Sequence, residues 1–252
     1  MFVSILSSAM GITILFLIAL ILVVLLQPSW VVRTLLRHLV PGVIFCGDGR
    51  RKELALTIDD SPSKPIHGLS AGASSRNLLE VLRRLDIPAT FFVISGHINE
   101  ADPDFIQLAL SDGHRIGHHM TEDHVSARLS SLDFRQSFDR AAEDLHRAAE
   151  PHALSLRWFR PGGGWIRSSM LQTVAEKGYR LVLGSVFPWD TFHPPLALMR
   201  WFVLRNVHPG AILIIHDRAD TVQASMELLY HVVPLLRQRG YRFVDLDRLL
   251  NV

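Results

Sequence analysis

Carboxylates and a histidine stand at the ends of apolar runs in this chain. Asp59 and Asp60 follow the run that begins at Leu54, and His216 ends a later run that begins at Ala211. Adjacent side chains at the end of a strand point in different directions, so the two carboxylates can take two roles. A histidine in such a place can act as a general acid when a carboxylate orients it. Taken alone, the two aspartates also suit a turn that caps a helix, and a single histidine in such a place is more often structural.

A second group of residues carries donor atoms that suit a metal ion. The segment 117–124 contains three histidines, a glutamate and an aspartate. Neutral imidazole and carboxylate form a suitable ligand set for Zn²⁺ or a similar divalent ion. The single cysteine, Cys46, excludes a thiolate zinc cluster and an intramolecular disulfide framework. Any metal must therefore bind to histidines and carboxylates.

Three consecutive glycines follow Arg160 in the segment 158–165. Glycines expose backbone N–H groups that can approach an oxyanion closely, although a plain glycine-rich turn has the same composition. The pattern G-x-x-x-x-G-K-[ST] is absent from the sequence, which argues against a phosphate loop. These glycines are therefore candidates for stabilising negative charge on a reacting oxygen.

The elements that must position these residues alternate along the chain. Helical patterns separate the apolar runs, which predicts a parallel sheet with helices around it. Seven such units favour a closed or nearly closed α/β barrel, with a doubly wound sheet as the alternative. In a barrel, the reacting groups gather at the carboxyl ends of the strands, and Asp190 lies in the loop after the fifth strand. The predicted strands are 54–58, 89–95, 114–119, 156–160, 179–185, 211–216 and 241–246, and the predicted helices include 75–85, 103–111, 133–149, 168–177 and 221–239.

The chain begins with an uncharged segment, because no Lys, Arg, Asp or Glu precedes Arg33. This length of apolar sequence predicts a transmembrane signal-anchor over residues 1–32, with a cleaved signal peptide as the alternative. A juxtamembrane linker over 33–52 and a single domain over 53–252 would follow. The arginines after the segment favour a cytoplasmic domain in a single-pass membrane protein.

Composition limits the remaining possibilities. The chain has 252 residues, of which 48% are hydrophobic, and its formal net charge is +2. This hydrophobic content excludes a disordered protein, and the balanced charge argues against nucleic acid as a partner. The sequence carries no signal for a particular oligomeric state.

The order of these motifs resembles the polysaccharide deacetylases of carbohydrate esterase family 4, also called the NodB homology domain. Residues 57–60 (T-I-D-D) resemble the T-F-D-D motif of that family, and 119–123 (H-M-T-E-D) resemble its H-S-x-x-H motif. Residues 159–161 (F-R-P) resemble its R-P-P-Y-G motif, and 214–217 (I-I-H-D) its L-L-H-D motif. The segment 89–93 (A-T-F-F-V) is similar to the family's second strand.

The resemblance implies a distorted (β/α)7-type barrel and a hydrolase that uses a divalent metal, zinc or a similar ion such as cobalt. Such an enzyme removes acetyl groups from N- or O-acetylated glycans. Because these substrates usually lie outside the cell, the resemblance favours an extracytoplasmic domain, whereas the arginines after the N-terminal segment favour a cytoplasmic one. The resemblance implies that Asp59 is the general base and that Arg160 orients it. It also implies that Asp60 and His119 bind the metal.

The resemblance further implies that His216 is the general acid, oriented by Asp190. A backbone N–H near Gly163 would stabilise the oxyanion together with the metal. The metal would polarise the acetyl carbonyl, Asp59 would take a proton from water, and His216 would give one to the leaving nitrogen.

Two motifs depart from the family pattern. The family has its second histidine four residues after the first, where this chain has Asp123, followed by His124. A helical turn would bring Asp123 to the metal as the third ligand, whereas one extra residue in the turn would bring His124 inward. Three glycines stand where the family has Pro-Tyr-Gly, so the aromatic ring that would contact a sugar is missing. Trp165 and Trp189 are candidates to supply such a ring.

Two other functions compete with glycan deacetylation. One is hydrolysis of another amide or ester, such as a lipid-linked acylated sugar, for which a narrow apolar cleft would be expected. The other is a non-catalytic, membrane-anchored binding module on the same fold. The polar groups at so many strand ends argue against this module, because unpaired buried polar atoms cost about 1–3 kcal/mol each.

Overall fold

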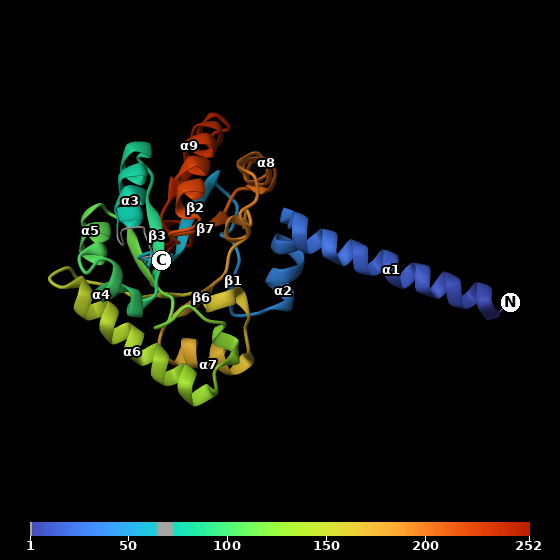
Figure 1. The fold of residues 1–252 in the computed structure, drawn as a ribbon, viewed down its shortest axis with the longest axis horizontal. Helices are drawn as coiled ribbons and strands as arrows, with labels where there is room; N and C mark the ends of the chain where they lie inside the picture. The colour runs from blue at the N-terminus through green and yellow to red at the C-terminus, as the bar shows by residue number, and fades with distance from the viewer. Residues whose placement is uncertain (1, 65–72) are drawn as a thin grey trace.

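The apolar runs assemble into one curled parallel sheet (Figure 1). The computed structural model describes residues 2–64 and 73–252, and their strands pair in the order β1-β6-β5-β4-β3-β2-β7, with β8 beside β2. All seven predicted strands are present, with ends that differ by a few residues. The strands are β1 (Val43–Ile44), β2 (Glu53–Ser61), β3 (Ala89–Val93), β4 (Arg115–His118), β5 (Trp158–Phe159), β6 (Arg180–Val182), β7 (Ala211–His216) and β8 (Arg242–Val244).

The curl of the sheet is that of a half-barrel, which confirms the predicted parallel α/β architecture. Strand β2 lies between β3 and β7, and all nine of its residues are buried. This burial agrees with the largely apolar run 54–58 in its middle, because central strands of a parallel sheet are covered on both faces. Isolated bridges from Cys46 and Val186 reach the end strand β7 at Ala211 and Leu213.

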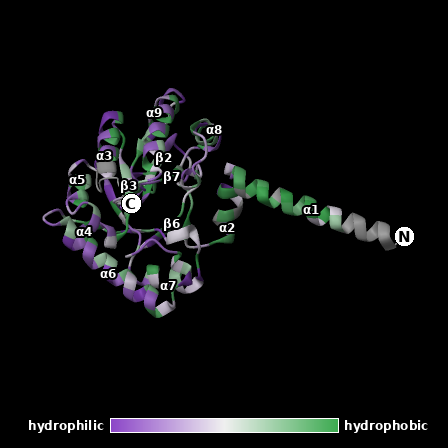
Figure 2. Cartoon of the chain, in the orientation of Figure 1, coloured by the Kyte–Doolittle hydropathy of each residue, from purple (hydrophilic) through white to green (hydrophobic). Residues whose placement is uncertain are grey.

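Helices cover the outside of the sheet, and the five predicted helices are all present. Figure 2 shows α3, α6 and α9 with both hydrophobic and hydrophilic stretches, as amphipathic helices on a sheet require. The α-helices are α1 (Phe2–Leu26), α2 (Arg37–Leu39), α3 (Ala73–Leu85), α4 (Ile98–Ala101), α5 (Phe105–Ser111), α6 (Ser131–Ala149), α7 (Ser168–Glu176), α8 (Leu196–Asn206), α9 (Val222–Gln238) and α10 (Leu246–Leu249). Single turns are η1 (Val31–Leu36), η2 (Ser95–His97), η3 (Ser126–Arg128), η4 (Gly162–Gly164) and η5 (Asp190–Phe192).

The N-terminal part of the chain differs from the sequence-based expectation in two ways. No helix within residues 2–64 and 73–252 combines the length and the hydropathy that crossing a membrane requires, so the predicted transmembrane anchor is not supported. In addition, residues 43–44, expected in a linker, form β1 and pair in parallel with β6. Figure 1 shows α1 extending away from the sheet, with its C-terminal end beside the domain.

The two ends of β2 are polar for different reasons. At the amino end, the side chain of Glu53 is only 3% exposed and forms ion pairs with Arg51, Arg242 and Arg248 at 2.9–3.2 Å. At the carboxyl end, β2 terminates in the two aspartates that the sequence singles out. Strand β2 is therefore fixed by an ion-pair network at one end and presents reactive groups at the other.

A cluster of phenylalanine rings supports the strands on the other side of the site. Phe134 and Phe138 of α6 contact Phe159 of β5, with ring centroids 5.8 and 5.1 Å apart. His118, at the end of β4, stacks on Phe138 at 4.0 Å and is completely buried. Burial of each ring contributes about 1.5–3 kcal/mol, so this cluster firmly positions the ends of β4 and β5.

Candidate active site

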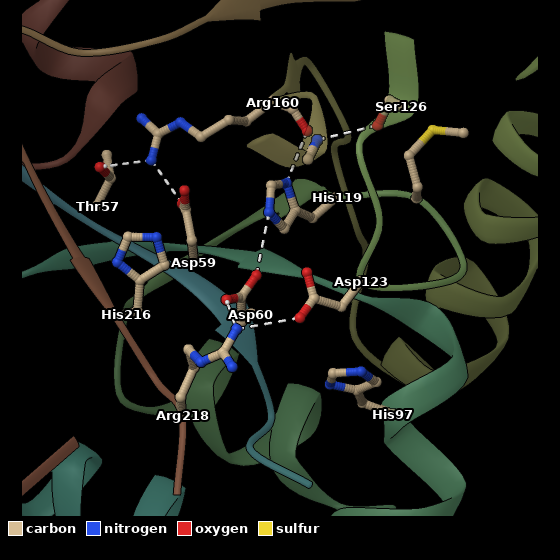
Figure 3. A network of polar contacts seen from close by, with 12 residues as sticks. Thr57, Asp59, Asp60, His97, His119, Asp123, Ser126, Arg160, His216 and Arg218 are labelled. Atoms are coloured by element: carbon tan, nitrogen blue, oxygen red, sulfur yellow. Dashed lines mark hydrogen bonds and ion pairs between the residues drawn. The ribbon is translucent and has the colours of Figure 1, made fainter. Parts of the chain in front are cut away.

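The end of β2 is shaped so that both aspartates face the site. The pairing register between β2 and β3 shifts between Ile58 and Ser61, and Asp60 has a left-handed backbone with φ of 64°. A bulge of this kind bends a strand and redirects its side chains. Asp59 and Asp60 are 5% and 7% exposed, and Figure 3 shows their carboxylates pointing into the same network from adjacent positions.

Asp59 is held by Arg160, which follows β5. Arg160 Nη1 donates to Asp59 Oδ1 and also to Thr57 Oγ1, the latter at 2.9 Å. The other guanidinium nitrogens donate to the backbone carbonyls of Val182 and Leu183, so the arginine itself is fixed by β6 and the residue after it. Burial lowers the pKa of Arg160, yet its ion pair with Asp59 opposes that shift. The structure thus places Arg160 in contact with Asp59, and its role in orienting that carboxylate stays a prediction.

His216, at the end of β7, is held by Asp190. Its backbone N–H donates to Asp190 Oδ2 at 2.7 Å, and its Nδ1 donates to Asp190 Oδ1 at 3.1 Å. Burial alone would lower the pKa of His216, but Asp190, Asp59 and Asp60 outweigh burial and raise it to about 9. The carboxylate of Asp190 is fully buried and also accepts a bond from Ser225. His216 is therefore a fixed, protonated imidazole at neutral pH.

Asp60 and His119 form the second pair of the site. His119 Nε2 lies 3.3 Å from Asp60 Oδ1, and its Nδ1 donates to the carbonyl oxygen of Arg160 at 2.7 Å. Burial raises the pKa of Asp60, but His119, His216 and Arg218 outweigh it and lower that pKa to about 2. Burial lowers the pKa of His119, but the hydrogen bond to Asp60, the charges of Asp59 and Asp60 and the bond to the Arg160 carbonyl together outweigh burial, so the net shift is upward.

Asp123 and His124, the two candidates for a third ligand, point to different partners. Arg218 Nη1 lies 3.1 Å from Asp123 Oδ2 and 3.6 Å from Asp60 Oδ2, so the two carboxylates converge on one cationic nitrogen (Figure 3). His124 Nδ1 instead lies 3.7 Å from Glu122 Oε2. The structure therefore brings Asp123, rather than His124, toward Asp60.

The donor set fits a divalent ion in chemistry but is not gathered into a complete cluster. Among residues 2–64 and 73–252, no three His, Cys, Asp or Glu side chains lie close enough together to hold a metal ion. However, an imidazole whose other nitrogen is bound to a carbonyl is the usual state of a histidine ligand, and His119 has this arrangement. The guanidinium of Arg218 stands as a cation between Asp60 and Asp123.

The three glycines form a tight turn at η4. Gly162 N donates to Ser126 Oγ at 2.9 Å, and Gly164 N donates to Pro161 O at 3.2 Å. Gly163 has φ of 73°, and a Cβ there would meet Val125 at 3.1 Å, so glycine suits this position. The role of Gly163 in stabilising an oxyanion stays a prediction.

The two tryptophans that the sequence singles out lie in different surroundings. Trp165 follows η4 and is 70% exposed. Trp189 packs against Phe187, with ring centroids 4.9 Å apart, and its indole donates to the backbone oxygen of Leu25. Trp165 is thus free to contact a ligand, whereas Trp189 is engaged with the end of α1.

A polar cavity of about 580 Å³ opens beside Asp60 and Asp123. Apart from Gly96 and Ala219, every described residue that lines it has a polar or charged side chain. This lining differs from the narrow apolar cleft expected for an acylated lipid.

Sequence reasoning missed several residues that shape the site. Arg218 directly follows the motif that contains His216, so its charge was visible in the sequence, but its reach to Asp123 was not. Thr57 and Ser126 lie in or near the recognised motifs and act as hydrogen-bond partners of Arg160 and Gly162. No local pattern reveals such partners, because the fold brings them from distant parts of the chain.

Residues 47–182 match the polysaccharide deacetylase family. The chain is also 30% identical over 202 residues to a peptidoglycan-N-acetylglucosamine deacetylase of Bacillus cereus, an alignment that covers 79% of this chain and 89% of that protein. This chain belongs to the polysaccharide deacetylase family. The resemblance drawn from the motifs is confirmed, and the chain is a hydrolase acting on carbon–nitrogen bonds other than peptide bonds. A non-catalytic binding module is therefore not supported.

One further sequence comparison and one structural comparison support this membership. It is 27% identical over 209 residues to a chitooligosaccharide deacetylase of Bradyrhizobium, covering 79% of this chain and 90% of that protein. It also resembles the crystal structure of the Bc1960 peptidoglycan N-acetylglucosamine deacetylase in complex with a benzamide, with a TM-score of 0.75 and 25% identity, covering 89% and 96% of the two chains. The curled sheet is thus the fold of this family.

Proposed function

We propose that this polysaccharide deacetylase removes acetyl groups from an N- or O-acetylated glycan, with Asp59 as the general base and His216 as the general acid. The observation that carries the proposal is that each of these two groups has its own fixed partner. Arg160 holds Asp59, and Asp190 holds His216. Asp59 and His216 are paired positions on the adjacent strands β2 and β7, so both face one substrate site.

The proton transfers follow from this placement. A water oxygen attacks the acetyl carbon while Asp59 takes one of its protons, and Arg160 keeps the Asp59 carboxylate in position. The carbon–nitrogen bond then breaks, and the leaving nitrogen takes the proton of His216, so that acetate and a free amine result. A pKa of about 9 keeps His216 protonated at neutral pH, as an acid at this step must be.

We further propose that Asp60, His119 and Asp123 hold a divalent ion, zinc or a similar metal. When bound there, the ion supplies polarisation of the acetyl carbonyl. The low pKa of Asp60 supports this role, because a ligand carboxylate must be ionised. The contact of Asp123 and Asp60 with the same guanidinium nitrogen of Arg218 supports Asp123 as the third donor over His124.

The polar cavity supports a carbohydrate as the substrate. Sugars present hydroxyl and amide groups that polar side chains can bind, whereas an acyl chain needs apolar walls. The relatives named for peptidoglycan and chito-oligosaccharides favour an acetylated amino-sugar polymer or oligomer. Trp165, exposed after the glycine turn, offers a ring on which a sugar can stack. The polar lining disfavours a lipid-linked acylated sugar as the alternative substrate.

The test compares metal content and acetate release for the full chain and for His119→Ala, with acetylated chito-oligosaccharides and a small acetyl ester as substrates. His146→Ala is the matched control, because His146 is exposed on α6. We expect stoichiometric metal and acetate release in the wild type and the control, and loss of both in His119→Ala. A wild type that binds no metal after reloading, or a His119→Ala variant that stays fully active, would contradict the proposal.

A further inference from the structure

The end of α1 is hydrogen-bonded to the loop that carries Asp190. Gln27 Nε2 donates to Phe187 O at 3.2 Å, and Gln27 Oε1 accepts from Phe187 N at 3.1 Å. The Trp189 indole Nε1 donates to Leu25 O at 3.1 Å. Three hydrogen bonds therefore join two segments that lie about 160 residues apart in the sequence.

The same loop contacts the general acid on its other side. The ring of Phe187 lies edge-on to His216, with centroids 5.5 Å apart. Asp190, three residues after Phe187, binds both the backbone N–H and Nδ1 of His216. The loop 187–190 thus lies between the end of α1 and the imidazole of His216.

The backbone of this loop needs support from outside. Trp189 has a left-handed conformation, with φ of 62° and ψ of 26°, which a bulky side chain seldom adopts. Such a conformation persists when the surrounding contacts determine it. The indole bond to Leu25 and the packing of Trp189 between Phe187 and Phe192, with ring centroids 4.9 and 5.7 Å away, are contacts of this kind.

We propose that Gln27 is a positioning residue of the active site, which fixes the loop 187–190 so that Asp190 aligns His216. The inference rests on the proposed role of His216 as the general acid. Gln27 contacts the loop and not the imidazole, so it acts through Phe187 and the backbone that leads to Asp190. The N-terminal segment is thereby a part of the catalytic structure.

The experiment uses the full chain with Gln27→Ala, and Gln107→Ala as the matched control. Gln107 also donates from Nε2 to backbone carbonyls, those of Ala148 and Glu150, but at α5 and α6. The readouts are kcat and KM for acetate release, and the ¹⁵N–¹H NMR signals of the His216 amide and the Trp189 indole. In Gln27→Ala we expect both signals to shift and kcat to fall about threefold to tenfold, with KM changed less than about twofold.

A second variant tests the same contact without removing the side chain. Gln27→Glu keeps the length of the side chain and the oxygen that accepts from Phe187 N, but it places a carboxylate oxygen, which cannot donate, near Phe187 O, so both signals should shift and kcat should fall as in Gln27→Ala. If Gln27→Ala does not fold, Gln27→Glu carries the test with the same readouts.

Unchanged His216 and Trp189 signals and an unchanged kcat would overturn the inference, as would equal effects in Gln107→Ala. The NMR signals report on the loop without any turnover. An inactive wild type would therefore refute the proposed function, while the NMR comparison would still decide the role of Gln27.

Discussion

The two sides of the active site are constrained to different degrees. On the proton-transfer side, Arg160 is 3% exposed and Asp190 is fully buried, and each binds its catalytic partner directly. On the metal side, Asp123 is 50% exposed and contacts Arg218, which is itself 39% exposed. A side chain that transfers a proton needs a partner that fixes its position, whereas a side chain that binds an ion must be able to change its position when the ion binds. In the proposed site, the partners of the proton-transfer groups are therefore rigid, and Asp123 is the donor that can adjust to an ion, since Asp60 and His119 are buried.

The rigid side should show the largest effect of a single substitution. Asp59→Asn keeps the size of the side chain but removes the base, so we expect acetate release to fall by about 10²–10⁴-fold. Metal content should stay near that of the wild type, because Asp60 and His119 are untouched. Both quantities are measured on the same preparation, with the exposed Asp139→Asn as the control. Retained turnover in Asp59→Asn would show that another group is the base.

On the more exposed side of the site, substitutions of Asp123 and His124 can identify the third ligand of the proposed metal. Asp123→Ala should weaken metal binding by about tenfold or more, because one of three proposed donors is lost. His124→Ala should bind metal like the wild type, because His124 faces Glu122. Titration of each variant against a chelator of known affinity measures the difference. If His124→Ala loses metal affinity and Asp123→Ala does not, His124 is the third ligand. The exposure of Asp123 would then no longer distinguish the two sides of the site.

The role of Asp190 as the partner of His216 can be tested through the pH dependence of kcat/KM and of stability. Burial lowers the pKa of His216, but Asp190, together with Asp59 and Asp60, outweighs burial and raises that pKa from 6.5 to about 9. Because the folded pKa lies above the unfolded one, this group stabilises the fold fully below about pH 6.5 and loses that contribution as pH rises through about 9. Asp190→Asn should therefore move the alkaline limb of kcat/KM to lower pH and destabilise the protein most in acid. A pH profile of kcat/KM for Asp190→Asn that coincides with that of the wild type would contradict the assignment of His216 as the general acid.

Arg218 should give the smallest effect. Its guanidinium would compete with the proposed ion for Asp60 and Asp123, and it is partly exposed, so the competition would be screened. Arg218→Gln should tighten metal binding by up to about fivefold, as measured by the same chelator titration. Weaker binding in Arg218→Gln would mean that the arginine helps to assemble the site instead of competing for it.

Much of the rigid side was predictable from the sequence, because it depends on strand ends. Asp59, Arg160 and His216 each end or follow an apolar run, and parallel strands bring such ends together at one edge. The helices around them were predictable from their apolar periodicity. The short strand β1 was not, since two residues carry no periodic signal and β1 forms by pairing with β6.

The adaptable side was harder to predict for a physical reason. Whether Asp123 or His124 faces the site depends on the turn after β4, where Met120 has φ of 69°. Sequence spacing does not reveal this single backbone conformation. The bonds of Gln27 to Phe187 are likewise invisible in the sequence, because they join segments separated by most of the chain.

The ion pairs of Glu53 have a consequence for how this enzyme can change over evolutionary time. Glu53 and its three arginines lie at the amino end of β2, and the reactive aspartates lie at the carboxyl end. Substitutions near the reactive end therefore do not touch the ion pairs of Glu53. Because the two ends are separated along one strand, we expect residues at the reactive end to tolerate exchange without loss of the ion pairs that hold the other end.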